Sequence, residues 1–76
     1  MFVTIAKVHE NVFQGEALSV TVPTTEGEIT IMPKHEAFVA TLKEGNIVVR
    51  TLEESKTFFA QSGVLEISNN QVTVLL

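Results

Sequence analysis

The chain has 76 residues, a net charge of −4 at pH 7 and no cysteine, with 45% hydrophobic and 18% charged residues. This length allows one domain, residues 1–76, and the absence of cysteine excludes disulfides and thiolate metal sites. The few basic residues argue against nucleic acid as a partner, and no apolar run approaches the roughly 18 residues needed to insert into a bilayer.

Apolar and polar residues alternate along most of the chain, which is the periodicity of β-strands. In chain order the predicted strands are 2–6, 17–22, 29–31, 38–42, 47–52, 57–60, 64–67 and 72–75. Turn residues separate them at 9–11, 23–27, 43–46, 53–56 and 69–70. This spacing predicts an all-β fold, a sandwich or barrel of roughly eight to ten short, mostly antiparallel strands.

Two turns carry specific conformational signals. Pro33 cannot donate a ladder hydrogen bond, so we expect a bend or a sheet edge between the strands that flank it. Asn tolerates positive φ, and Asn69-Asn70 therefore predicts a tight hairpin between the last two strands.

The sequence shows none of the common catalytic or nucleotide-binding patterns. All nine acidic residues are Glu, and there is no G-x-S-x-G, no phosphate-binding loop and no G-x-G-x-x-G. We therefore predict no catalytic residues and no cofactor. The pairs His9-Glu10 and His35-Glu36 raise the possibility of a metal site of the cupin type, but adjacent strand residues face opposite ways. A metal would require His9 and His35 to meet in space, and we expect solvated or interfacial histidines instead.

Two features suggest a protein-binding role. The segment from Gly27 to Gly45 contains a Pro-Lys-His corner between two apolar strands, and this corner presents His35 beside aliphatic residues. Phe58 and Phe59 are adjacent on a predicted strand, so one of them must face outward if the other faces the core. An outward Phe is either sheltered by another part of the fold or part of a partner-binding face.

The order and spacing of several short motifs resemble the N-terminal β-sandwich domain of the epsilon subunit of F1Fo ATP synthase, over nearly the whole chain. The matching residues are Val12-Phe13-x-Gly15-Glu16, Val20, Pro23, Gly27-Glu28, Pro33-x-His35, Leu42, Gly45, Ser62-Gly63-x-Leu65-Glu66-Ile67 and Asn70-x-Val72-Thr73-Val74-Leu75.

The chain also departs from the family pattern. The family usually has Gly at Thr30, Gly or Asn at Lys34, Pro at Ala37 and Gly at Val64, so local bends are expected to differ. The family usually continues into a C-terminal helical hairpin, which is absent from this sequence. The chain is therefore expected to be either a naturally short member or a piece of a longer one.

The resemblance implies a non-catalytic subunit of the rotor, or central stalk, that couples the gamma subunit to the c-ring during proton-driven ATP synthesis. It places Gly27 and Glu28 against the c-ring loops, and His35 and Phe38 against gamma. It also implies a peripheral location, on the cytoplasmic face of a bacterial inner membrane or the stromal face of a thylakoid. The alternative is a free-standing β-sandwich that binds proteins through the region of Phe58 and Phe59.

Overall fold

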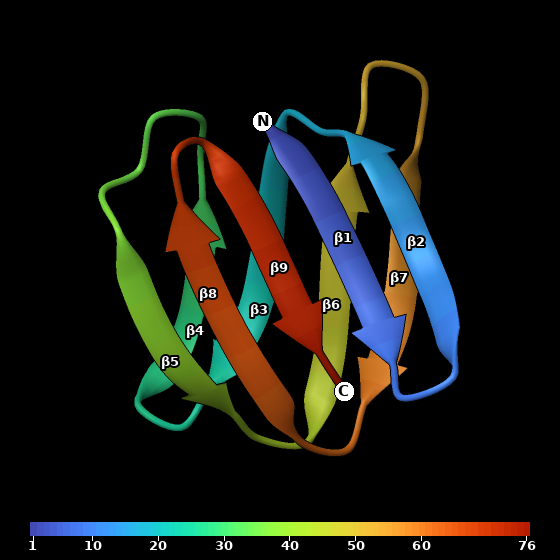
Figure 1. The fold of residues 1–76 in the computed structure, drawn as a ribbon, viewed down its shortest axis with the longest axis vertical. Helices are drawn as coiled ribbons and strands as arrows, with labels where there is room; N and C mark the ends of the chain where they lie inside the picture. Colours follow the sequence, from blue (N-terminus) through green and yellow to red (C-terminus); the bar gives the residue numbers. More distant parts are fainter.

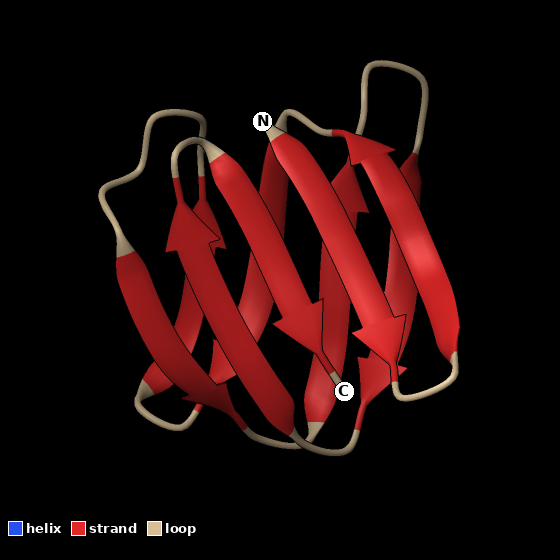
Figure 2. Ribbon diagram, in the orientation of Figure 1, coloured by secondary structure: helices blue, strands red, loops and turns tan.

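The structure is a computed structural model that describes all residues from 1 to 76, and it contains nine strands and no helix (Figures 1 and 2). The strands are β1 (Phe2–Lys7), β2 (Glu10–Glu16), β3 (Ser19–Thr24), β4 (Gly27–Ile31), β5 (Phe38–Leu42), β6 (Gly45–Arg50), β7 (Ser55–Ala60), β8 (Gly63–Ser68) and β9 (Gln71–Leu75). The predicted all-β fold is therefore confirmed, and the strand number lies within the expected range.

The nine strands form one hydrogen-bonded sheet that curls into two layers, with β4 branching off the main path by pairing with β3 (Figure 1). The front layer has the order β2-β1-β9-β8-β5, and the back layer has the order β4-β3-β6-β7. The layers are joined where Thr24 of β3 pairs with Leu42 of β5. All pairs are antiparallel except β1 with β9, which brings the first and last strands side by side.

The core lies between the layers and is almost entirely aliphatic. Its largest fully buried side chains are Ile5, Ile31, Leu42, Ile47, Leu65 and Ile67, with Val3, Val20, Val22, Val49, Val72 and Val74. Each of β1, β6, β8 and β9 has two fully buried residues at alternate positions, which is the alternation that the sequence predicts. Branched side chains at alternate positions suit this two-layer packing because they fill the space on a pleated surface with few rotamers to lose.

Strand β2 is missing from the sequence-based prediction. Its sequence, ENVFQGE, has no residue buried in the core, and only Val12, Phe13 and Gly15 are partly covered. The turn that we expected at 9–11 lies instead at Val8 and His9, and Glu10 already belongs to the strand. An edge strand with little burial has no period-two apolar signal, and its pairing with β1 shows only in three dimensions.

The expected break at 23–27 is also shorter than predicted. Pro23 and Thr24 are buried residues of β3, and only Thr25 and Glu26 form the turn. β3 pairs with β6 as far as Thr21 and with β5 at Thr24, so Pro23 lies where the neighbouring strand changes. A proline is tolerated at this position because no ladder hydrogen bond requires its missing N–H.

Candidate partner-binding surface

The β4–β5 connection forms the predicted Pro-Lys-His corner. Lys34 has a φ of 68°, in the left-handed region, and its N–H donates to the side-chain Oδ1 of Asn70 at 2.8 Å. A residue with a Cβ pays roughly 1–2 kcal/mol for this conformation. The corner thus keeps this conformation although Lys34 stands where the family that the sequence resembles usually has Gly or Asn. The hydrogen bond from Lys34 to Asn70 of the β8–β9 turn stabilises it.

His35 and Phe38 come together on the outside of this corner. Their ring centroids are 5.9 Å apart and tilted by 57°, and both side chains are exposed, Phe38 by 40%. The Nδ1 of His35 lies 2.7 Å from the backbone carbonyl of Glu36, which fixes the orientation of the imidazole. Both predicted residues therefore belong to one small aromatic surface.

Gly27 and Glu28 lie at the other end of β4. Gly27 has a φ of +126°, which only glycine adopts without strain. The Thr24 hydroxyl donates a hydrogen bond to the Gly27 carbonyl and accepts one from the Glu26 N–H. The Glu28 side chain is exposed and makes no ion pair. A fixed turn with an exposed carboxylate can accept a basic group from a partner without first giving up an internal contact.

A shallow hollow lies between these two predicted sites. It has a volume of about 260 Å³ and is bordered by Thr24 at the end of β3, by Thr25 and Glu26 of the β3–β4 turn, and by Phe38–Thr41 of β5. The four predicted residues therefore do not form one cluster, because Gly27 begins β4 whereas His35 lies in the loop after its other end. Phe38 and the turn that begins β4 nevertheless border the same side of the sandwich (Figure 1).

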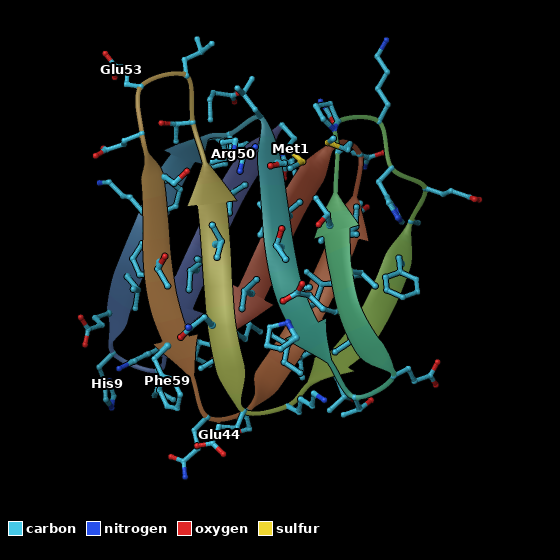
Figure 3. All side chains as sticks on the ribbon, turned by 180° about the vertical axis from the view of Figure 1, so that it is seen from behind. Met1, His9, Glu44, Arg50, Glu53 and Phe59 are labelled. Atoms are coloured by element: carbon cyan, nitrogen blue, oxygen red, sulfur yellow. The ribbon has the colours of Figure 1, made fainter.

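The two predicted faces of strand β7 are confirmed. Phe58 turns inward and packs against Phe13 of β2, with ring centroids 5.7 Å apart, and the ammonium group of Lys56 lies 5.7 Å from the Phe13 centroid. Phe59 faces outward and is 60% exposed, close to the lower end of the molecule in Figure 3. Phe13 and Phe58 thereby cover the side of the sandwich between edge strands β2 and β7.

The two histidines do not meet. His9 lies in the β1–β2 turn at the lower end of Figure 3, whereas His35 follows β4 at the end of the sandwich that holds Met1. The structure contains no group of three or more His, Cys, Asp or Glu side chains that is placed to hold a metal ion. The fold also has no helix capable of crossing a membrane.

One apolar end of the molecule was missed by the sequence analysis. Leu18 and Leu52 are exposed beside Met1 and Pro33, and these residues border a hollow of about 380 Å³ together with Glu16, Ala17, Thr51 and Glu53. We expected strands to include Leu18 and Leu52, but each lies in a connection between strands. The available signal was Leu52, which stands next to Glu53-Glu54 in a turn. An apolar side chain at such a position cannot pack into the core and stays exposed.

Comparison with known proteins identifies the fold and the family. The whole chain, residues 1–76, matches the family described as the β-sandwich domain of the ATP synthase delta/epsilon chain. The ATP synthase epsilon chain of Hydrogenovibrio crunogenus is 37% identical over 99% of this chain and 52% of its own length. That of Delftia acidovorans is 35% identical over 96% of this chain and 54% of its own length. The chain thus spans about half the length of these relatives.

Solved structures agree on the fold. A chain of the mitochondrial ATP synthase of Euglena gracilis superposes with a TM-score of 0.89 at 21% identity, covering 96% of this chain and 48% of that one. A chain in the central stalk and c-ring structure of the Tetrahymena thermophila mitochondrial enzyme gives a TM-score of 0.84 at 21% identity, covering 99% and 61%. Together with the match over residues 1–76, these findings establish that the chain belongs to the ATP synthase delta/epsilon chain β-sandwich family.

Proposed function

We propose that this chain is a non-catalytic part of the rotor of an F-type ATP synthase, where it couples the gamma subunit to the c-ring. The observation that carries the proposal is the match of all 76 residues to the delta/epsilon β-sandwich family. The solved structures to which the chain is similar belong to ATP synthase assemblies that include the c-ring. In this role the chain lies at the membrane surface as part of a complex.

The structure supports a division of the surface between two partners. Glu28 offers an unpaired carboxylate on a fixed turn, which suits a basic loop such as one of the c-ring. Gly27 sets the direction of that turn. His35 and Phe38 offer an exposed aromatic pair, which suits the buried centre of an interface with gamma. The aliphatic core holds the two sites at a constant separation, as torque transmission requires.

The test is reconstitution into ATP synthase from which the epsilon subunit has been removed. We expect the chain to co-purify with gamma and the c-ring and to restore proton-driven ATP synthesis. Glu28→Lys should weaken binding to the c-ring, and Glu10→Lys serves as the matched control because Glu10 is an exposed carboxylate on edge strand β2. A folded chain that binds neither partner would overturn the proposal.

A second candidate function is favoured by Phe59. This side chain is 60% exposed on an edge strand and contributes nothing to the core, which is compatible with a separate protein-binding face. If Phe59→Ser abolishes association with a cellular partner while gamma and the c-ring fail to bind, the chain acts as a free-standing binding module.

A further inference from the structure

The side of the sandwich between β4 and β5 is open. β4 pairs only with β3, and β5 pairs along its full length with β8 but with β3 only where Thr24 meets Leu42. β4 and β5 run past each other as neighbouring edges without pairing (Figure 1). The opposite side differs, because Phe13 and Phe58 pack together there.

Pro23 determines which backbone groups of β4 face this open side. Pro23 is opposite Glu28, and because a proline has no N–H, these two residues form a non-hydrogen-bonded pair. Such pairs alternate along an antiparallel ladder, so Thr21 and Thr30 form the next one. Their hydroxyl oxygens are 2.9 Å apart, in agreement with the closer approach of side chains at these positions. The N–H and C=O groups of Glu28 and Thr30 therefore point away from β3.

β5 adds unpaired groups on the same side. The carbonyl of Thr41 accepts a hydrogen bond from the Thr25 N–H at 3.0 Å, across the seam between the layers. Residues two apart on a strand direct their backbone groups to the same neighbour, so the N–H and C=O of Val39 point to the same side as those of Thr41. No strand reaches them, and the Val39 side chain is itself exposed.

The space between the two edges can receive side chains. The hollow of about 260 Å³ has Phe38, Val39 and Ala40 on one wall and the β3–β4 turn on the other. A strand laid along the free edge of β4 would direct every second side chain toward this hollow. Its remaining side chains would lie on the outer face beside Glu28 and Thr30, both of which are exposed.

The charge at this edge indicates which kind of strand can bind there. Glu26 and Glu28 are exposed at this edge, while Lys34 and Lys43 lie outside it in the flanking loops. A second copy of the chain would bring its own exposed Glu26 and Glu28 to this edge and would add another net charge of −4. A segment with basic residues at the outward positions meets the opposite charge instead.

We propose that the open side between β4 and β5 binds an extended segment of a partner protein as an additional strand on β4. The segment carries apolar residues at alternate positions, which enter the hollow beside Phe38, and Lys or Arg between them, which face Glu28. Backbone groups of Glu28 and Thr30 supply the hydrogen bonds, in the manner of β-strand addition. The inference rests on the proposed function in taking this side of the sandwich as the partner-facing side.

The first test uses a capped seven-residue synthetic peptide with Val at alternate positions and Lys and Thr at the others. In NMR titration of the 15N-labelled chain, we expect shifts centred on the amides of Glu28, Thr30 and Val39. A peptide with the same sequence but N-methylated at alternate residues, and one with Glu replacing Lys, should bind at least tenfold more weakly. The inference is overturned if the peptide leaves these three amides unchanged at millimolar concentration, or if N-methylation has no effect.

Thr30→Pro removes one edge donor without touching the β3–β4 hydrogen bonds, and Thr30→Val removes the same hydroxyl contact while keeping the N–H. We expect Thr30→Pro to bind the peptide roughly threefold to tenfold more weakly than Thr30→Val, the effect of one backbone hydrogen bond. Equal affinity of the two folded variants contradicts the inference. If Thr30→Pro does not fold, Glu28→Lys takes its place, and undiminished affinity for the basic peptide is then the contradicting result.

The peptide titration and the binding of gamma and the c-ring together separate this inference from the proposed function. If the wild-type chain binds gamma and the c-ring but the peptide leaves the amides of Glu28, Thr30 and Val39 unchanged, the rotor role stands and strand addition is wrong. If the wild-type chain binds the peptide at the β4 edge but neither gamma nor the c-ring, the edge site stands and the rotor role is wrong.

Discussion

Gly45 of β6 lies so close to Pro23 of β3 that any side chain at position 45 would overlap it. A Cβ added to Gly45 would be 2.9 Å from the Pro23 Cβ and 3.0 Å from its Cγ. Pro23 is buried at the place where β3 passes from β6 to β5 and cannot withdraw without disturbing both layers. The two residues therefore form a matched pair, in which the proline ring occupies the space that the glycine leaves.

We predict that Gly45→Ala destabilises the fold by about 1–3 kcal/mol, the usual cost of inserting a methyl group into a packed site. Gly15→Ala is the matched control, because a Cβ there meets only the Phe13 ring at an ordinary 3.5 Å. Thermal unfolding followed by circular dichroism measures both. A melting temperature for Gly45→Ala as high as that of Gly15→Ala would show that Pro23 moves freely.

Phe38→Glu is expected to weaken binding to gamma while leaving the fold largely intact, because Phe38 is 40% exposed and contacts His35 outside the core. Loss of an aromatic at an interface centre costs on the order of 2 kcal/mol or more of binding free energy. Phe58→Glu is the control, because Phe58 packs against the core and against Phe13. It should unfold the chain first. The surface role of Phe38 is rejected if the two variants lose the same stability in urea titration.

Gly27→Ala should cost about 1–2 kcal/mol of stability for a purely backbone reason. Nothing lies within 4 Å of a Cβ added at Gly27, but the φ of +126° is strained for any L-residue. A synthetic chain with D-alanine at position 27 should retain the wild-type stability, because positive φ is favourable for a D-residue. Equal destabilisation by L- and D-alanine would point to a steric cause.

Asn70 is distant from the β4–β5 corner in the sequence, but its side chain accepts a hydrogen bond from the Lys34 N–H and is expected to stabilise the corner. Asn70→Gly keeps the positive φ of 58° accessible and removes only this bond, so we expect a loss of about 0.5–1.5 kcal/mol. Asn70→Ala should cost about 1 kcal/mol more, because alanine is strained in the left-handed region. Hydrogen exchange should accelerate at the Lys34 amide in both variants, and unchanged protection there would contradict the link.

The sequence predicts the strands that contribute to the core and fails where a strand contributes little. β1, β6, β8 and β9 show the period-two alternation because one face of each is buried between the layers. β2 lies at an edge, and its side-chain contacts come from the adjacent Val12 and Phe13 and from Glu16, which pairs with the N-terminus. These positions do not alternate, so the strand carries no such period. Pro23 was predicted to lie in a turn for a related reason. A proline is tolerated inside β3 because the neighbouring strand changes from β6 to β5 there, and this change is a property of the tertiary structure.

The candidate surface is predictable to a similar extent. The Pro-Lys-His corner follows from the fixed φ of Pro33, and the turn at Gly27 follows from the access of glycine to positive φ. The opposite faces of Phe58 and Phe59 follow from the pleat. The contact between His35 and Phe38 depends on the course of the loop between them. The edges of β4 and β5 are unpaired because no strand lies between them. Local sequence patterns do not show which strands remain unpaired in the tertiary structure.

The parallel pairing of β1 with β9 has a consequence for biosynthesis. The β1–β2 hairpin leaves the ribosome first, but the other edge of β1 stays unpaired until the residues of β9, up to Leu75, have emerged. β9 also joins β1 to β8, so the front layer closes only at the end of translation of this segment. Contacts so distant in sequence slow folding. The apolar face of β1, which carries Val3 and Ile5, therefore stays without β9 beside it until the last residues of this segment have been made.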